Sequence, residues 1–338
     1  MKLDLAWKRL LARRLLRSAL AIASAAAFIG CAGPGAEKRP RPATTDRSGR
    51  NMDCIGRFQF SLPETLTVTG RKQTIYTVDV STIASPPGGA MTVWNERMSR
   101  INALSPPQGV NRVVARTFQL QTGVPAVWYF RSKESPELLA LEAMKALPDH
   151  VLIVNRGADL DAPERQVILQ GGGQEIVERL VKNVIDAYVP AATLGFCVGY
   201  GAITSKPSKN EETRIMLGHR SLGDLKIRIE THTVTAPDTR TYSDLDEESH
   251  QAAARGGQMT VMSEAARPVA GLPGKEMRIS VASPGERPFV RFTWHFSGVP
   301  GRSDQPAIDI AGMADTNNVT QLQAAWESLL QSMRTVPF

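Results

Sequence analysis

Two strand-rich segments of nearly equal length, each closed by an amphipathic helix, constrain the fold of this chain most. The first segment runs from Cys54 to a helix predicted to end near Tyr188, and the second from Cys197 to a helix before Thr335. Apolar residues at three- and four-residue spacing mark each helix. They are Ile176, Val177, Leu180, Val181, Val184, Ile185 and Tyr188 in the first, and Val319, Leu322, Trp326, Leu329, Leu330 and Met333 in the second.

Between these ends, strand signals dominate, and the segment 190–195 has the composition of a short hinge. β-Branched and aromatic residues predict strands at 58–62, 74–80, 110–120, 124–130, 214–217, 225–231, 259–262, 276–281 and 289–296. A helix is predicted over 91–104, and residues 136–155 fit a helix or a strand. The sequence therefore predicts an α+β protein with mainly antiparallel sheets, in two domains at 51–190 and 191–338.

The N-terminus predicts export. A basic stretch at 2–17 precedes thirteen mostly apolar residues at 18–30, which suit a signal peptide and are short for a bilayer span. Phe28-Ile29-Gly30-Cys31 resembles a bacterial lipobox, whose cysteine is lipidated and becomes the mature N-terminus. By that resemblance residues 1–30 are a lipoprotein signal peptide, and Ala32 after the cysteine favours the outer membrane. The alternative is an ordinary signal peptide cut nearby, with Cys31 incidental.

The excess positive charge lies in the N-terminal extension. The chain has a formal net charge of +7, but residues 1–50 hold eleven of its 40 Lys and Arg residues and three of its 33 Asp and Glu residues. The rest is nearly balanced, which argues against a nucleic-acid partner. Residues 31–50 combine Pro, Gly and charge without a large apolar side chain, so they are predicted to form a flexible tether.

Export also bears on the cysteines. With Cys31 acylated, Cys54 and Cys197 remain as an even pair in an oxidising compartment, where a disulfide is favoured. The alternative is two buried free thiols.

No familiar catalytic or metal-binding pattern emerges. The five histidines show no metal-ligand spacing, and the chain has no Gly-x-Ser-x-Gly elbow. The tryptophans of the mature part occupy positions compatible with a core. Four acidic residues follow Ser243 at a predicted helix start: Asp244, Asp246, Glu247 and Glu248. We interpret them first as a solvated, capped turn, and alternatively as a patch for a basic partner. We therefore expect no cofactor, metal or small-molecule substrate.

Several motifs resemble one protein family in their order and spacing. Cys54-Ile55-Gly56-Arg57-Phe58 with Ser61-Leu62-Pro63 is similar to the opening of two-domain type VI secretion immunity proteins, the inhibitors of antibacterial lipase (phospholipase) effectors. The start of their C-terminal domain resembles 196–203 with Asn210-Glu211-Glu212. The similarity extends through Gly271–Glu276, Phe292-Thr293-Trp294 with Gly298, and the helix that carries Trp326.

This resemblance implies a two-lobed, claw-like protein that binds its cognate lipase in the periplasm and blocks it without catalysis of its own. A lipid anchor on the outer membrane would hold it beside the membrane that the lipase attacks. Two other interpretations stay open. One is a membrane-tethered envelope module that binds a different protein, and the other is an enzyme with an unfamiliar site.

Overall fold

The computed structural model describes residues 52–136, 138–148, 150–159, 173–186, 195–199, 201–204, 210–236 and 257–336. All of them belong to one compact unit. The predicted signal peptide, the tether, Cys31 and the four acidic residues at 244–248 lie outside the described residues. Among the described residues, no helix combines the length and apolar character needed to cross a bilayer.

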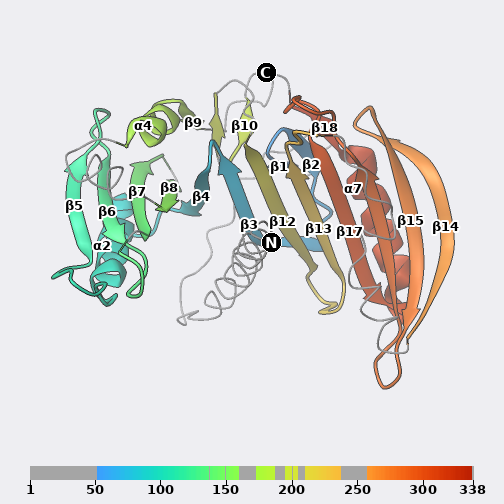
Figure 1. Cartoon of the computed structure of the whole chain (residues 1–338). Coiled ribbons are helices and arrows are strands. Elements are labelled where there is room, and N and C mark those ends of the chain that lie inside the picture. Colours follow the sequence, from blue (N-terminus) through green and yellow to red (C-terminus); the bar gives the residue numbers. More distant parts are fainter. Residues whose placement is uncertain are drawn as a thin grey trace, which may run out of the picture. The chain divides into compact units, whose positions relative to one another are not determined.

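Twelve of the described strands form one antiparallel sheet. The strands are β3 (Leu66–Ile75), β4 (Val78–Ala84), β5 (Val114–Gln119), β6 (Pro125–Phe130), β7 (Leu138–Ala146), β8 (His150–Asp159), β12 (Glu211–His219), β13 (Lys226–His232), β14 (Gln258–Val269), β15 (Leu272–Ala282), β16 (Phe289–Phe296) and β17 (Ala307–Asp315). Their order is β14-β15-β16-β17-β13-β12-β3-β4-β8-β7-β6-β5 (Figure 1). The predicted antiparallel sheet is confirmed, with few helices beside it.

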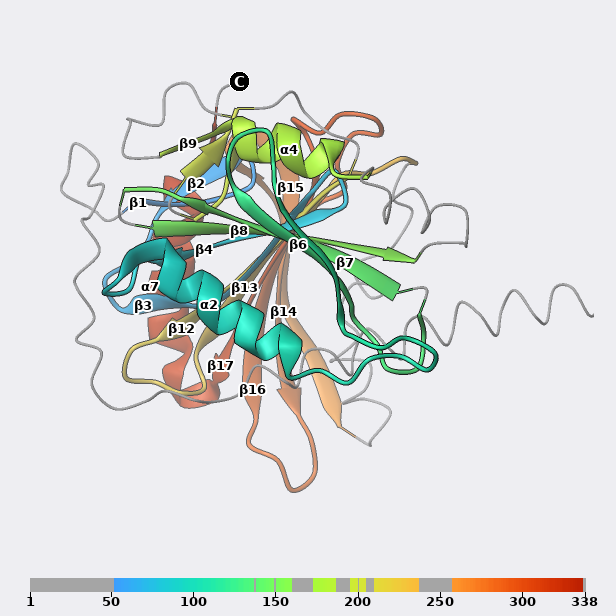
Figure 2. The same ribbon diagram turned by 90° about the vertical axis from the view of Figure 1, so that its left-hand side faces the viewer.

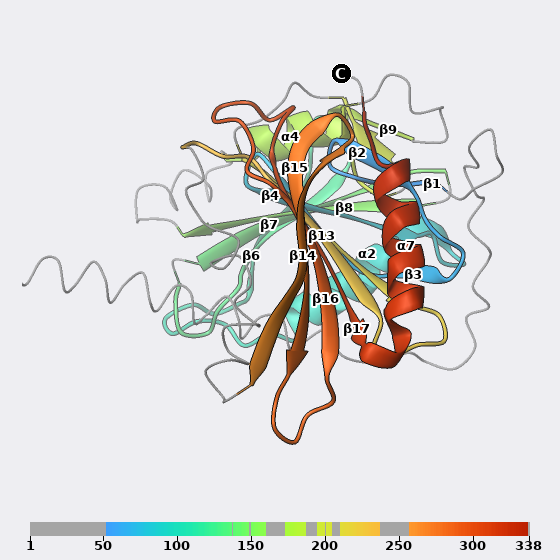
Figure 3. The ribbon, with the colours of Figure 1, turned by 90° about the vertical axis from the view of Figure 1, so that its right-hand side faces the viewer.

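Two small sheets and four helical segments complete the described fold. One sheet joins β1 (Met52–Ile55), β2 (Phe58–Ser61) and β18 (Arg334–Thr335), and the other joins β9 (Val184–Asp186), β10 (Phe196–Cys197) and β11 (Gly201–Ile203). The α-helices are α2 (Gly89–Asn102), α4 (Glu175–Lys182) and α7 (Val319–Ser332), and η2 (Thr316–Asn318) is a 3-10 turn before α7. Helix α2 packs on β7 and β8 (Figure 2), and α7 packs on β2 and β17 (Figure 3).

Different helices cover the two faces of the twelve-stranded sheet. Ile227 of β13 points toward α7, because its side chain and those of Leu322 and Trp326 surround Gly312. Helix α4 contributes Val177, Leu180 and Val181 to the same cluster as the β3 residue Ile75. We call the side that carries α4 and α7 the inner face. Side chains alternate along a strand, so the neighbours of Ile227 point to the opposite side, the outer face. Helix α2 covers that face at β7 and β8, through contacts such as Val93 with Ile153.

Two large apolar clusters fill the inner face, and they do not follow chain order. One unites Phe58 and Phe60 of β2 and Leu66 of β3 with strands β12–β17 and helix α7. The other unites Ile75 at the end of β3 with β4, β6–β8, α4 and Phe196. Strand β3 thus contributes to both clusters. The predicted boundary between residues 190 and 191 falls outside the described residues, so the division into two domains and the claw stay predictions.

Two predicted elements differ in the structure, and one open alternative is decided by it. The helix predicted to reach Tyr188 ends at Lys182, because Val184–Asp186 forms β9 and pairs with β11. The strand predicted over 74–80 is a hairpin, in which Tyr76 and Thr77 form the turn with φ of 52° and 66°. The turn contains no Gly, Asn or Asp, the residues that usually mark a hairpin turn, so the sequence did not indicate it. The ambiguous segment 136–155 forms strands β7 and β8.

Strand β17 had no counterpart in the prediction, and neither had β1, β10, β11, β18 and the first part of β3. Strand β17 alternates between buried residues, such as Ile308 and Ile310, and half-buried ones such as Asp309. Its small residues produce only a weak strand signal in the sequence. The predicted helices at 91–104 and before Thr335 are confirmed as α2 and α7.

Candidate functional site

Cys54 and Cys197, which open the two strand-rich segments of the sequence, lie together on the inner face. The structure joins Cys54 of β1 and Cys197 of β10 by a disulfide, with their Cα atoms 6.0 Å apart. The Cys197 amide donates to the Gly56 carbonyl at 2.7 Å, and Gly56 has a φ of 54°. A glycine suits that left-handed conformation. This junction connects β1 to β10 and thus links the openings of the two matched segments.

Two ion pairs stand beside the disulfide. The sequence did not predict them, although Arg57 and Glu211 lie in the two opening motifs. Arg57 donates to both carboxylate oxygens of Glu211 at 2.8 and 2.6 Å, and both side chains are almost fully buried. Arg71 donates to Asp53 at 2.7 Å. Buried bidentate pairs of this kind fix the relative position of their strands. These charges are therefore engaged within the protein.

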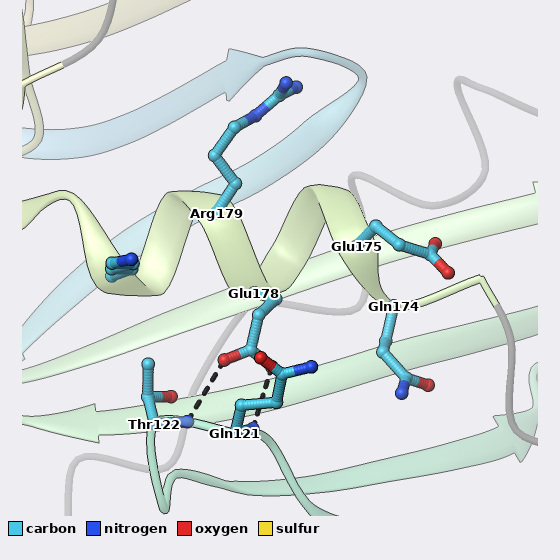
Figure 4. A pocket seen from close by; sticks show the side chains of 7 residues that line it. Gln121, Thr122, Gln174, Glu175, Glu178 and Arg179 are labelled. Carbon is cyan, nitrogen blue, oxygen red and sulfur yellow. Dashed lines mark hydrogen bonds between the residues drawn. The ribbon is translucent and has the colours of Figure 1, made fainter.

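A polar groove lies where α4 meets the tip of the β5–β6 hairpin (Figure 4). Its lining residues are Gln121, Thr122, Gln174, Glu175, Glu178, Arg179 and Lys182. Both oxygens of the Glu178 carboxylate accept backbone N–H groups, from Gln121 and Thr122, at 3.0 Å each (Figure 4). The Arg179 guanidinium stacks on the Tyr76 ring, 4.8 Å from its centroid. Two of the four charged groups thus hold α4 to neighbouring segments.

A Ser-His-Asp chain occurs at the end of β16. His295 Nδ1 lies 2.6 Å from Asp309 Oδ1, and His295 Nε2 lies 3.1 Å from Ser297 Oγ. The order of atoms is that of a hydrolase triad. However, the histidine is only 7% exposed, and the serine and histidine are two residues apart at one strand end. No local pattern in the sequence indicates this arrangement, because its acid lies on the neighbouring strand.

The remaining candidates from the sequence give little chemistry. Trp128, Trp294 and Trp326 are buried, as predicted for core residues. Within the described part of the chain, no group of three or more His, Cys, Asp or Glu side chains is arranged to hold a metal ion. Asp244, Asp246, Glu247, Glu248 and Cys31 lie outside that part.

Comparison with known proteins bears on this geometry. Among curated proteins, none matches the chain. The apo structure of immunity protein TplEi of the type VI secretion system from Pseudomonas aeruginosa matches with a TM-score of 0.65 and 15% identity, over 86% of this chain and 99% of that chain. The Tle4–Tli4 complex matches with a TM-score of 0.66 and 14% identity, over 87% and 99%. TplEi complexed with the "L" peptide matches with a TM-score of 0.60 and 15% identity, over 87% and 100%.

These structural matches establish a shared fold over most of the described chain. Residues 189–337 match the family described as the Tle cognate immunity protein 4 C-terminal domain. This segment begins close to the second opening motif and ends after α7. The family match over residues 189–337 and the shared fold therefore confirm the predicted resemblance to type VI secretion immunity proteins.

Proposed function

We propose that this protein is an immunity protein that binds and inhibits a cognate type VI lipase effector in the periplasm. The observation that carries the proposal is the family match over residues 189–337. The shared fold with TplEi and with the Tle4–Tli4 complex supports it. So does the predicted export signal, because the inhibitor must reach the compartment in which the lipase attacks phospholipids.

The direct test is co-production of the tagged full-length chain with the product of an adjacent lipase-like gene. We expect a stable complex, and we expect the phospholipase activity of the partner to be abolished in it. A lipase that stays fully active beside the immunity protein would contradict the proposal. Deletion of the gene should make cells sensitive to rival strains that deliver the effector.

We further infer that Cys31 is lipidated and anchors the protein to the outer membrane. Its support is the apolar stretch that ends directly on this cysteine. A tether of about twenty residues would raise the local concentration of inhibitor at the membrane. The variant Cys31→Ser should move the protein from the membrane fraction to the soluble periplasm; retention in the membrane would refute the anchor.

A protein-binding envelope module with another partner is the second candidate. It shares the export signal and the tether, and differs in having no toxic enzyme as its target. An adjacent assembly operon, with no lipase-like gene, would favour it.

Among the described residues, the Ser297–His295–Asp309 chain is the observation that favours an enzyme. We expect it to be structural, because its imidazole is buried and the serine reaches it only along the same strand. A fluorophosphonate probe, which labels activated serines, should therefore leave the chain unmodified. Labelling that is lost in Ser297→Ala would overturn the non-enzymatic role.

A further inference from the structure

We propose that the effector binds through acidic groups to a basic patch on the outer face of the central strands. This patch consists of Lys72 of β3, Arg214 of β12, and Lys226 and Arg228 of β13. The inference rests on the proposed function and names the surface to which the effector binds. Its partner is an effector surface that presents carboxylates.

Strand register places the four cations on one face. Arg214 pairs directly with Lys72 on one side and with Glu230 on the other. Arg228 and Lys226 precede Glu230 at two-residue steps along β13, so they share its side. The alternate residues Ile215, Ile227 and Ile229 are buried in the cluster that holds α7. The cations therefore point away from that cluster.

The patch has more positive than negative charge. Glu230 serves two arginines at once, since it pairs with Arg214 and lies 3.6 Å from the Arg228 guanidinium. Within the described part of the chain, Lys72 and Lys226 have no ion-pair partner, and both are exposed. On this face of β3, β12 and β13 the acids are Glu212 and Glu230, which leaves an excess of positive charge. Asp309 of β17 stands opposite Glu230, where it is engaged with His295 at 2.6 Å.

The two neighbouring cations Lys72 and Arg214 destabilise the folded sheet rather than stabilise it. Lys72 and Arg214 stand directly opposite each other across β3 and β12, where like charges are destabilising. A solvated face gains stability when opposite charges alternate across strands. A partner with carboxylates at this position would relieve the repulsion, so charge complementarity selects an acidic surface as the occupant.

Apolar residues between the charges suit a protein partner. Met216 is the direct neighbour of Arg228, and Met313 of β17 is the direct neighbour of Lys226. Both methionines are half-buried on the outer face. Met and Arg are enriched in protein interfaces, whereas lipid headgroups or inorganic anions gain nothing from thioether contacts at this depth.

The experiment compares two charge reversals of equal size in the full-length chain. The test variant is Lys72→Glu/Lys226→Glu, and the matched control is Arg112→Glu/Lys133→Glu, which reverses two exposed cations outside both the patch and the α4 groove. Affinity for the purified lipase effector is measured at low and high salt. We expect the test variant to lose about tenfold or more in affinity, and to lose the salt dependence, while the control stays near wild type.

Stability separates a lost contact from a damaged fold. The carboxylate that Lys72→Glu introduces would face Arg214, so the test variant should melt at the same temperature as wild type or higher, although it binds more weakly. Unchanged affinity of the test variant beside normal wild-type binding would overturn the patch alone. A larger loss in the control would contradict the patch and move the interface to the segments that carry Arg112 and Lys133. No binding by the wild-type chain would overturn the proposed function as well.

Binding to lipid vesicles distinguishes a membrane from the effector as the partner of the patch. Vesicles of anionic phospholipid should bind the test and control variants equally, because both carry the same change in net charge. A selective loss of vesicle binding in the test variant, with effector affinity intact, would show that the patch serves a membrane and would contradict the proposal.

Discussion

Packing against a tryptophan explains one glycine of the motifs quoted above. Gly274, within the motif that links β14 and β15, lies beneath the Trp294 ring. A Cβ atom there would stand 2.2 Å from Trp294 Cζ2. The ring is buried, and its Nε1–H donates to the Arg267 carbonyl at 2.8 Å, so it cannot move aside without losing that bond. The glycine and the tryptophan are thus one packing unit.

Gly274→Ala should therefore destabilise the protein. Overpacking of this kind lowers the free energy of unfolding by about 1–3 kcal/mol. Urea denaturation measures the effect, with Gly223→Ala as control because a Cβ at Gly223 meets open space. Equal midpoints for the two variants would show that the Trp294 ring has another position.

Single elements are fastened to the sheet by charged groups as well as by apolar contacts. Helix α2 directs Arg97 toward Glu142 of β7, whose side chain is 1% exposed and also accepts from Asn155 at 3.2 Å. The hydrogen bond with Glu142 raises the pKa of Arg97. Helix α7 places Glu327 between Arg267 of β14 and Arg278 of β15. Phe292 meets Trp326 of the same helix edge to face, with ring centroids 6.0 Å apart.

Removing one partner of the α2 pair should cost more than removing both. Arg97→Met leaves the Glu142 carboxylate buried without its cation, and we expect a loss of about 3 kcal/mol in unfolding free energy at pH 7. Arg97→Met/Glu142→Leu should recover most of that loss. Calorimetry of the three proteins checks this; a double variant less stable than Arg97→Met would contradict it.

The Glu327 contacts predict a pH dependence. Hydrogen bonding from Arg267 holds the pKa of Glu327 below its ordinary value of 4.5. Because the folded pKa is depressed, the stabilisation is complete above pH 4.5 and disappears as the pH falls through the lower folded value.

Glu327→Gln should therefore reduce the unfolding free energy by about 1 kcal/mol or less at pH 7, and by progressively less under acid conditions. Glu64→Gln, at an exposed turn residue, is the control. A difference between wild type and Glu327→Gln that grows toward low pH would contradict the assignment.

At the scale of the whole molecule, strand pairing in two different sheets joins segments distant in sequence. Strand β3 pairs with β12, and β18 near the C-terminus pairs with β2 near the start of the described chain. The Cys54–Cys197 disulfide spans 143 residues of sequence beside these pairings. A cross-link across so long a loop restricts the unfolded chain, with a stabilisation of about 5 kcal/mol on the chain-entropy account.

Cys54→Ala/Cys197→Ala should therefore lower the unfolding free energy by several kcal/mol, up to about 5 kcal/mol. Reduction with dithiothreitol should have the same effect on wild type and none on the variant. Non-reducing mass spectrometry should find the two cysteine peptides linked, and two free thiols would contradict the disulfide.

The sequence alone determined the class of elements. Alternation and β-branched residues located most strands of the twelve-stranded sheet, and three- and four-residue spacing located α2 and α7, because both signals are local. It missed the Tyr76-Thr77 turn and the end of α4 at Lys182, where tertiary contacts override the local pattern. The motif order was also enough to indicate the family.

Only the tertiary structure decided which strands are neighbours. Pairing in an antiparallel sheet joins residues far apart in the chain, and no local pattern records the register. The basic patch is an example: Lys72 and Arg214 are ordinary surface cations in the sequence, and they become a repulsive pair only when β3 and β12 align. The triad-like chain at His295 and the buried Arg57–Glu211 pair arise in the same way. At such sites, the charge that surrounds a side chain and its burial depend on which strands lie next to each other. That arrangement exists only in the folded protein.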